Sequence, residues 1–333
     1  LAEAGEFTRR AFDNNKTDIT AAEGLADLID ANTSLQRIQA AAQMAGSLRR
    51  PVEHWRKEII CCLSDLEASI DFTDEDLPAT LETQIRNRIQ TIYSDMKAGL
   101  ADFHKGQIIR TGLSIVLVGP VNAGKSTLLN LLARRPAAIV SSMPGTTRDS
   151  IEVGLEIAGV SVAVKDTAGW RQTDDPIEKE GIERARQAAA DADILVVVVD
   201  GSQPGWSEDI DEMITWGSQN SLILLNKSDA GVVTDDKRHT ADRASKEAVL
   251  SISAKDGSGL SEFETQLEEI IQNLNRASSS ITLTRVRHQQ AVRQAVKNLE
   301  ASLNLSVANQ TELVAEEFRT ATSALSRILG HVD

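Results

Sequence analysis

Hydrophobic residues recur at helical spacing toward both ends of the chain. Residues 20–72 carry a long helical pattern, and residues 20–23 have the form of a capping box, which marks a helix start. Pro51 is expected to begin or kink a second helix. A further helix is predicted over residues 80–105, after an acidic turn at residues 71–78. The apolar positions that define these helices are Leu25, Leu28, Ile29, Leu35, Ile38, Val52, Trp55, Ile59, Ile60, Leu63, Leu66, Ile85, Ile89, Ile92 and Met96.

The middle of the chain, residues 112–273, alternates short apolar runs with helical patterns. This alternation is typical of a parallel sheet covered by helices. Its longest apolar run, residues 194–199, has the length of a central strand and is far too short to cross a membrane. After the serine-rich break at residues 278–280 the helical period returns and continues to Leu329, and Gly330 is expected to end the last helix.

A phosphate-binding signature lies at the start of this middle region. Residues 119–126 read G-x-x-x-x-G-K-S, between an apolar run and a helical pattern. Such a loop presents backbone N–H groups and the positive end of a helix to phosphate oxygens. Lys125 is expected to reach the β- and γ-phosphates, and the Ser126 hydroxyl to bind Mg²⁺. A purely structural strand–loop–helix could carry the same letters, so this motif alone leaves that alternative open.

Three further segments exclude that alternative, because they follow in the order that a GTPase requires. Residues 166–169 read D-T-A-G, in which Asp166 can hold Mg²⁺ through water and the Gly169 N–H can meet the γ-phosphate. Residues 226–229 read N-K-S-D, and the Asp229 carboxylate can accept two hydrogen bonds from guanine. Adenine would leave that carboxylate unpaired, which is costly. Residues 253–255, S-A-K, are expected to pack behind the base, so the predicted nucleotide is GTP.

The predicted site therefore draws on four motifs and on the loop that contains Thr147. We expect Thr147 to close on Mg²⁺ beside Ser126 only when the γ-phosphate is present, which orders the loop. The predicted GTP-binding residues are Asn122, Ala123, Gly124, Lys125, Ser126, Thr127, Ser141, Ser142, Met143, Pro144, Gly145, Thr146, Thr147, Asp166, Thr167, Ala168, Gly169, Asn226, Lys227, Asp229, Ser253, Ala254 and Lys255.

Composition and charge narrow the function further. A chain of 333 residues with 41% hydrophobic and 25% charged residues is typical of a globular protein with two or three domains. Its 35 basic and 49 acidic residues give a net charge of −14, which argues against holding nucleic acid mainly by phosphate neutralisation. The basic cluster at residues 285–288, with Arg293 beyond it, is more typical of a solvated helix face than of an RNA site.

The two cysteines and the first residue bear on the origin of the chain. Cys61 and Cys62 are adjacent, too close for an ordinary disulfide, and are expected to be buried small hydrophobic residues in a reducing cytoplasm. The chain has no initiator Met, and we expect it to be a fragment.

The two helical blocks on either side of the nucleotide-binding region predict an insertion. In a Ras-like domain the first strand and the last helix start and end near one another, so such a domain can interrupt a host domain without separating its halves. The apolar stripes of both flanks would then bury one another in a bundle. The predicted fold is an α/β Ras-like P-loop GTPase domain, a mostly parallel sheet flanked by helices, inserted into an all-α helical bundle.

Several segments resemble a known family. Asn122 in the P-loop, residues 144–149 (P-G-T-T-R-D) and the D-T-A-G segment resemble Era-like GTPases. Residues 181–185 (G-I-E-R-A), the helical flanks, and residues 5–12 (G-E-F-T-R-R-A-F) narrow the resemblance to the MnmE (TrmE) family of tRNA modification GTPases. The resemblance covers essentially all 333 residues. Most of the family's N-terminal folate-binding domain and its C-terminal tail with a cysteine are absent.

The resemblance also divides the chain. Residues 1–17 resemble the junction at the end of the folate-binding domain. Residues 18–111 and 276–333 are the two parts of the helical domain, and residues 112–275 are the G domain.

What the resemblance implies is a cytoplasmic, K⁺- and Mg²⁺-dependent GTPase that is activated when its G domains dimerise. The homodimer would work on tRNA, away from any membrane, with a flavin-dependent partner enzyme of the MnmG (GidA) type. Together they install an aminomethyl-type group at carbon 5 of a wobble uridine. A folate derivative bound by the missing domain supplies the one-carbon unit. Lys16 matches a position of that folate pocket, although by itself it is an ordinary exposed lysine.

The catalytic residues follow from what the sequence lacks. Trp170 stands where Ras places the glutamine that orients the attacking water, so another group must do this. Glu178 matches the family's catalytic glutamate, whereas Asp174, Asp175 and Glu180 are expected to be solvated loop residues. No arginine finger is evident, and a desolvated K⁺ could take its place. The family pattern suggests that Asn122, Ser141, Met143 and Thr146 would hold this K⁺.

The alternative is a ribosome-assembly GTPase of the Era or EngA kind, acting as an RNA-binding switch. Such a protein needs a basic RNA-binding domain after its G domain. The acidic, helical C-terminal block of this chain counts against that alternative.

Overall fold

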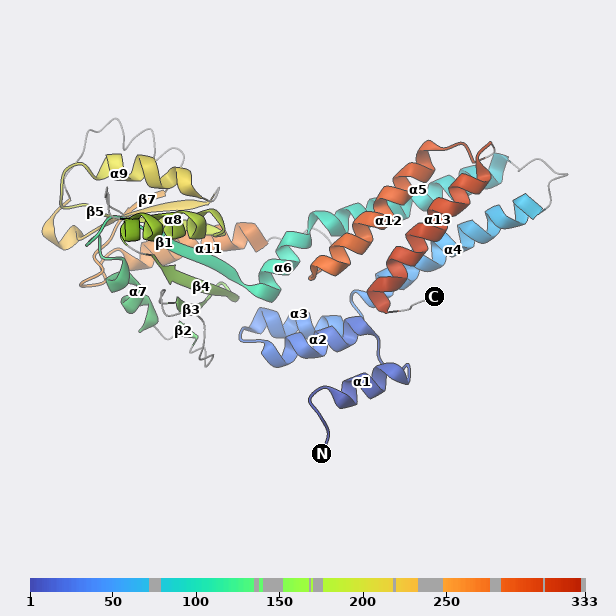
Figure 1. Cartoon of the computed structure of the whole chain (residues 1–333), viewed down its shortest axis with the longest axis horizontal. Coiled ribbons are helices and arrows are strands. Elements are labelled where there is room, and N and C mark those ends of the chain that lie inside the picture. Colours follow the sequence, from blue (N-terminus) through green and yellow to red (C-terminus); the bar gives the residue numbers. More distant parts are fainter. Residues whose placement is uncertain are drawn as a thin grey trace. The chain divides into compact units, whose positions relative to one another are not determined.

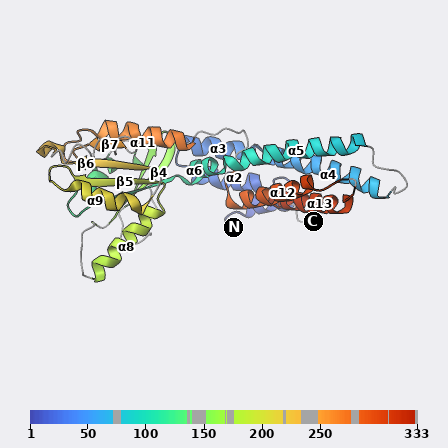
Figure 2. The ribbon, with the colours of Figure 1, turned by 90° about the horizontal axis from the view of Figure 1, so that it is seen from above.

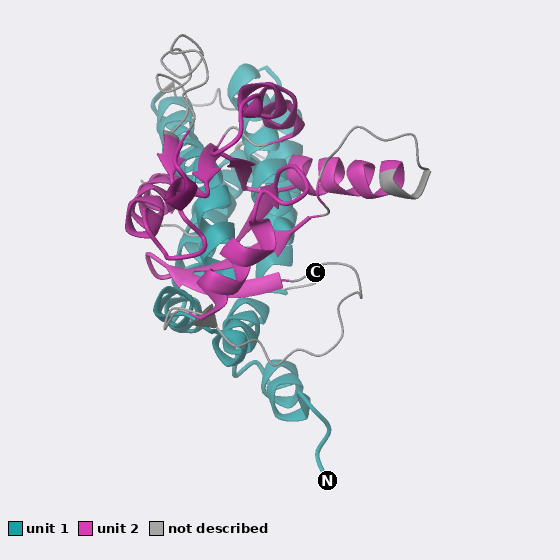
Figure 3. Ribbon diagram, turned by 90° about the vertical axis from the view of Figure 1, so that its left-hand side faces the viewer, with its two compact units in different colours: residues 1–110, 276–333 teal, residues 111–275 magenta. Residues whose placement is uncertain are grey.

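The structure is a computed structural model of the 333-residue chain. It describes residues 1–71, 79–134, 138–139, 152–167, 169, 176–217, 220–232, 248–275, 283–307 and 309–330. The chain divides into two compact units, residues 1–110 with 276–333, and residues 111–275 (Figure 3). Segments from both ends of the chain thus form one helical unit, and the middle of the chain is inserted into it, as predicted.

The helical unit consists of α1 (Glu6–Asp13), α2 (Ile19–Asp30), α3 (Ser34–Met44), α4 (Arg49–Asp71), α5 (Ala79–Ala101), α6 (Phe103–Thr111), α12 (Val286–Asn304) and α13 (Thr311–Leu329). Helices α4, α5, α12 and α13 lie alongside one another as a bundle (Figures 1 and 2). Their predicted apolar stripes face inward, and Trp55 and Phe318 are among the largest fully buried side chains. The two flanks therefore need each other to bury their hydrophobic residues.

The N-terminal helices differ from the sequence prediction in their boundaries. The long helical pattern over residues 20–72 is three helices, α2, α3 and α4, and Pro51 lies in the first turn of the last. The predicted capping box at residues 20–23 is wrong, because Asp18 is the cap and accepts hydrogen bonds from the backbone N–H groups of Thr20 and Ala21. A capping box does occur at Thr33, where α3 begins.

Of the other predictions for the helical unit, some are confirmed and some are wrong. The helix predicted over residues 80–105 is interrupted at Asp102, between α5 and α6. Ile29 and Ile38, expected on an apolar stripe, are 77% and 66% exposed. Cys62 is fully buried as expected, while Cys61 is only half-buried. Gly330 ends α13 in the left-handed conformation, with φ 82°, as expected of a helix stop.

The inserted unit is a seven-stranded sheet with helices on both faces. Its strands are β1 (Leu113–Val118), β2 (Ala138–Ile139), β3 (Glu152–Ile157), β4 (Val160–Asp166), β5 (Ile194–Asp200), β6 (Ser221–Asn226) and β7 (Ala248–Ser251). Its helices are α7 (Lys125–Ala133), α8 (Pro176–Ala190), α9 (Trp206–Met213) and α11 (Leu260–Asn275), with short 3₁₀ turns η1 (Ile214–Trp216) and η2 (Ser228–Ala230).

The strand order is β2-β3-β4-β1-β5-β6-β7. Strands β4, β1, β5, β6 and β7 pair in parallel, whereas β3 is antiparallel to both of its neighbours. Helices α8 and α9 pack on one face, and α11 covers the other (Figure 2). Strand β5 is central and buried along residues 194–199, which explains its unbroken apolar sequence. This is the order of a Ras-like domain, and the carboxyl ends of its parallel strands share one edge.

Candidate nucleotide-binding site

The P-loop follows β1 and leads into α7. Gly124 has φ 98°, and a Cβ added there would lie 2.1 Å from the Asn226 side-chain nitrogen, so only glycine fits. The Lys125 ammonium donates hydrogen bonds to the carbonyl oxygens of Gly119 (2.8 Å) and Pro120 (3.0 Å). Burial lowers the pKa of Lys125, and the nearby Asp166 carboxylate opposes that shift. A buried ammonium at a helix N-terminus is well placed to bind an anion.

Asn226, at the end of β6, ties two loops together. Its side chain is 2% exposed. Its amide nitrogen donates to the Ala123 carbonyl of the P-loop (2.7 Å), and its amide oxygen accepts from the Ala254 N–H (2.9 Å). The first residue of the N-K-S-D segment therefore holds the P-loop and the S-A-K segment in fixed positions.

Asp229, the residue predicted to recognise guanine, follows Asn226 in the N-K-S-D segment. The Asp229 carboxylate accepts a hydrogen bond from the Ser253 hydroxyl (3.0 Å), and the Lys255 ammonium lies 3.6 Å from its other oxygen. The Ser253 side chain is buried, whereas Lys255 is exposed. The structure thus brings the N-K-S-D and S-A-K segments together, with the Asp229 carboxylate in a defined orientation.

Sequence reasoning missed one participant, Asp200. It ends β5, directly opposite Asn226 in the sheet, and its carboxylate accepts a hydrogen bond from the Lys227 ammonium (2.7 Å). Ser202 donates two further hydrogen bonds to Asp200, from its N–H and its hydroxyl. Burial acts to raise the pKa of Asp200, but the hydrogen bonds from Lys227 and Ser202 outweigh it and lower that pKa. The signal in the sequence was a carboxylate at the carboxyl end of a buried parallel strand.

The D-T-A-G segment approaches the P-loop from β4. The Ser126 hydroxyl donates to one Asp166 oxygen (2.5 Å). The other oxygen, Oδ1, is buried and has no hydrogen-bond partner among the described residues. Thr167 is tied to the Leu117 carbonyl (2.7 Å), and a Cβ on Gly169 would come within 2.8 Å of the Val121 Cα. Gly169 therefore permits the close approach of this segment to the P-loop.

The remaining predicted residues divide into three groups. Asn122 has φ 64°, and both Asn122 and Thr127 are exposed. Lys16 is exposed in the turn after α1, as expected of it in isolation. The predicted residues that lie outside the described part of the chain, or whose side chains do, are Ser141, Ser142, Met143, Pro144, Gly145, Thr146, Thr147, Ala168, Asp174, Asp175 and Glu178.

Metal-binding clusters and membrane-spanning helices are both absent from the described residues. Within the ranges given above, His, Cys, Asp and Glu side chains do not gather in groups of three or more that could hold a metal ion. None of the described helices is long and apolar enough to cross a membrane.

Comparison with known proteins adds the family. Residues 19–333 match a family model described as the MnmE helical domain. The tRNA modification GTPase MnmE of Maricaulis maris is 43% identical over 333 residues, which are all of this chain and 73% of that protein. This chain belongs to the MnmE family. The MnmE of Caulobacter vibrioides is 42% identical and is matched over 74% of its length by the whole chain.

Solved structures give weaker likenesses. The Era protein of Aquifex aeolicus is 24% identical with a TM-score of 0.38, over 56% of this chain and 66% of that one. The G domain of the T. maritima FeoB iron transporter is 22% identical with a TM-score of 0.36, over 48% of this chain and 99% of that one. The fold assignment therefore rests on the strand order and on the MnmE family match, and not on these scores.

Proposed function

We propose that this member of the MnmE family binds GTP across the P-loop, the N-K-S-D segment and the S-A-K segment, and hydrolyses it in the course of tRNA modification. The observation that supports this best is the geometry at Asp229. Its carboxylate is oriented by Ser253, and the two loops beside it are braced by the buried Asn226. A carboxylate held in this way accepts from the N1–H and N2–H₂ of guanine and rejects adenine.

Mg²⁺ fits the residues at the phosphate end. The Ser126 hydroxyl and the unpartnered Asp166 Oδ1 are oxygen ligands of the kind that Mg²⁺ prefers. In our proposal Ser126 and Thr147 hold the ion and Asp166 orients its water ligands. When bound, the ion neutralises charge on the β- and γ-phosphates.

Apart from Asn122, the catalytic part of the proposal concerns residues that lie outside the described part of the chain or whose side chains do. Glu178 positions the attacking water, because Trp170 cannot. Asn122, Ser141, Met143 and Thr146 would hold K⁺, which would supply the positive charge that an arginine finger supplies elsewhere. In the proposed homodimer the two G domains meet across this region, and their meeting activates hydrolysis.

The biological setting is proposed from the MnmE relatives, which are named as tRNA modification GTPases. The homodimer acts on tRNA wobble uridines with a flavin-dependent partner enzyme. A folate derivative supplies the one-carbon unit, with Lys16 at the edge of its pocket. An RNA-binding switch of the Era kind is not favoured, because Arg285 and Arg287 are paired with carboxylates of this chain.

Exchange of the base tests the guanine reader. Asp229→Asn keeps an oxygen for the Ser253 hydroxyl but places an amide donor where the carboxylate could only accept. We expect the variant to prefer xanthosine triphosphate over GTP, measured as the ratio of kcat/KM for the two nucleotides. Asp256→Asn is the matched control, since Asp256 accepts from the Ser258 N–H (2.9 Å) and also contacts Ser253, so the variant shows the effect of disturbing Ser253 alone. If Asp229→Asn still prefers GTP, the site does not read guanine through this residue.

A further inference from the structure

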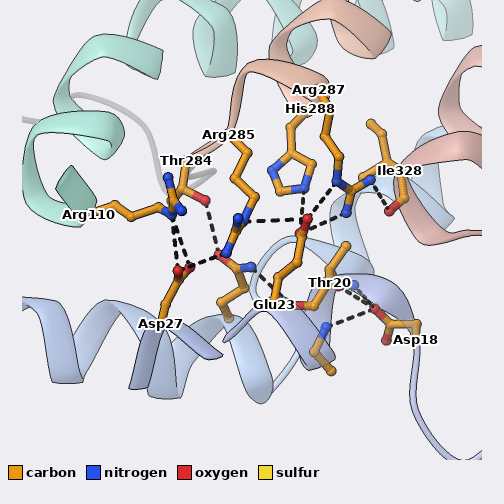
Figure 4. Close-up of polar contacts among 12 residues, drawn as sticks. Asp18, Thr20, Glu23, Asp27, Arg110, Thr284, Arg285, Arg287, His288 and Ile328 are labelled. Atoms are coloured by element: carbon orange, nitrogen blue, oxygen red, sulfur yellow. Dashed lines mark hydrogen bonds and ion pairs between the residues drawn. The ribbon is translucent and has the colours of Figure 1, made fainter. Parts of the chain in front are cut away.

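The sequence suggested that the basic cluster at residues 285–288 is a solvated helix face. In the structure this cluster is instead paired with carboxylates. Two carboxylates of α2, Glu23 and Asp27, lie one turn apart and bind it (Figure 4). His288 is fully buried, and the side chains of Glu23 and Asp27 are 16% and 17% exposed. Charges buried to this degree are costly unless paired, so the contacts hold the segments that carry them firmly in place.

Asp27 binds basic residues from both connections to the nucleotide-binding unit. The Arg110 Nε lies 3.1 Å from Asp27 Oδ1 and 3.3 Å from Oδ2, and an Arg285 terminal nitrogen lies 2.8 Å from Oδ1. Arg110 is the last residue of the helical unit before the chain enters the inserted unit at Thr111. Arg285 immediately precedes α12, just after the chain has returned to the helical unit.

Glu23 fixes the second of these connections. The Arg287 guanidinium donates to both of its oxygens, at 2.6 and 2.7 Å, and also to the Ile328 carbonyl at the end of α13. His288 Nε2 lies 3.0 Å from Glu23 Oε2. Burial lowers the pKa of His288, although the hydrogen bond to Glu23 opposes the shift. Because a carboxylate only accepts, it is the Nε2–H of His288 that donates in this contact.

Glutamines of α3 hold the same two connections through uncharged contacts. Gln36 and Gln39 donate to the carbonyl oxygens of Arg110 and Gly106, each at 3.2 Å. Gln43 accepts from the Thr284 hydroxyl (3.2 Å) and donates to the Thr20 carbonyl of α2 (3.0 Å). The pair of helices α2 and α3 thus grips the chain where it leaves the helical unit and where it returns.

The first connection is also the far end of a strand that carries a nucleotide loop. Arg110 precedes β1, and the opposite end of β1 carries the P-loop. On the other side, α11 begins shortly after the S-A-K segment and ends at Asn275, and the chain then returns to Thr284 and Arg285. β1 is paired on both sides within the sheet and cannot bend freely. A displacement of the P-loop can therefore be passed along β1 to Arg110 and the α2 carboxylates.

We propose that Glu23 and Asp27 form a clamp that fastens both connections of the nucleotide-binding unit to α2, and that this clamp transmits the nucleotide state to the α2–α3 pair. The transmission rests on the proposed function, since it requires a nucleotide at the P-loop. The attachment of the two connections to α2 does not depend on the proposed function, because these contacts need no nucleotide. The device is conformational, and its two states differ in how tightly the α2–α3 pair is held.

Hydrogen exchange of the full 333-residue chain tests the clamp. Without nucleotide, Asp27→Asn should exchange faster than the parent at residues 103–110 and 283–288. With a non-hydrolysable GTP analogue, Mg²⁺ and K⁺, the parent should change its exchange rates at the P-loop and, by about fivefold or more, at residues 19–44. Asp27→Asn should keep the P-loop response and lose the one at residues 19–44.

Two further variants make the test decisive. Arg285→Gln removes the ion pair between the returning connection and Asp27 and keeps every carboxylate. This variant should also lose the response at residues 19–44. Glu67→Gln is the control, because Glu67 binds Arg319 between α4 and α13 at 2.8 Å, away from both connections, and should respond as the parent does. The proposal is overturned if both clamp variants retain the parent's exchange at the connections without nucleotide. It is also overturned if the parent's P-loop responds to nucleotide while residues 19–44 do not. An unresponsive P-loop in the parent would contradict the proposed function, and the nucleotide-free comparison would still decide the clamp.

Discussion

Loss of the Asn226 side chain should weaken nucleotide binding, although Asn226 itself need not touch the nucleotide. Its side chain is 2% exposed and joins the Ala123 carbonyl to the Ala254 N–H. Ala123 and Ala254 are themselves buried, at 1% and 6% exposure. Asn226→Ala therefore removes both hydrogen bonds and leaves two buried backbone groups without partners.

The size of the effect follows from these two groups. A buried polar group that loses its partner costs roughly 1–3 kcal/mol, so the pair costs about 2–6 kcal/mol. In the empty protein the loops can relax and let water reach these groups, whereas a bound nucleotide holds them in place. Most of the cost therefore falls on the bound state, and because about 1.4 kcal/mol corresponds to tenfold, the GDP dissociation constant should rise by about 30-fold or more.

Titration with a fluorescent GDP derivative measures this directly. Asn220→Ala is the matched control, since Asn220 lies just before the opposite end of the same strand and its side chain donates a long hydrogen bond (3.4 Å) to the Asp193 carbonyl, away from both loops. The control should change the dissociation constant less than threefold. A similarly small change in Asn226→Ala would contradict this role of Asn226, because the two loops would then hold their positions without its side chain.

Two further predictions concern carboxylates. Hydrogen bonds from His288 and Arg287 outweigh burial and lower the pKa of Glu23 to about 2 from 4.5, so the folded state gains stability that is present above pH 4.5 and lost as the pH falls toward 2. The shift corresponds to about 3 kcal/mol, and urea unfolding at pH 6 and pH 3 should show Glu23→Gln losing much of the parent's acid sensitivity. Glu178→Ala should lower kcat by about two orders of magnitude yet bind a GTP analogue as the parent does. Asp174→Ala and Asp175→Ala should change kcat only a few-fold, and an equal loss in these neighbours would contradict a single catalytic glutamate.

Local patterns predicted the parts of this molecule whose cause is local. The P-loop was predictable because a buried strand, a glycine loop and a helix are adjacent in sequence, and the structure places Gly124 and Lys125 accordingly. The bundle was predictable because its apolar stripes run through consecutive helical turns, and Trp55, Ile89 and Leu299 are all buried. The inserted position of the sheet followed from the same stripes, since neither flank could bury them alone.

Three of the misreadings share a physical cause, which is pairing between distant residues. Glu23 was assigned to a capping box because of its spacing from Thr20, but it binds Arg287, 264 positions away. The basic cluster was assigned to solvent because its carboxylate partners lie on a helix more than 250 residues earlier. Asp200 was overlooked because its partner Lys227 is fixed by sheet register rather than by sequence spacing.

We propose that this chain hydrolyses GTP with K⁺ in place of an arginine finger, between two G domains. The rate of GTP hydrolysis in KCl and in NaCl, at equal ionic strength and over a range of protein concentrations, tests it most directly. We expect faster hydrolysis in K⁺, with a specific activity that rises with protein concentration. Equal rates in the two salts, or a specific activity independent of concentration, would contradict it.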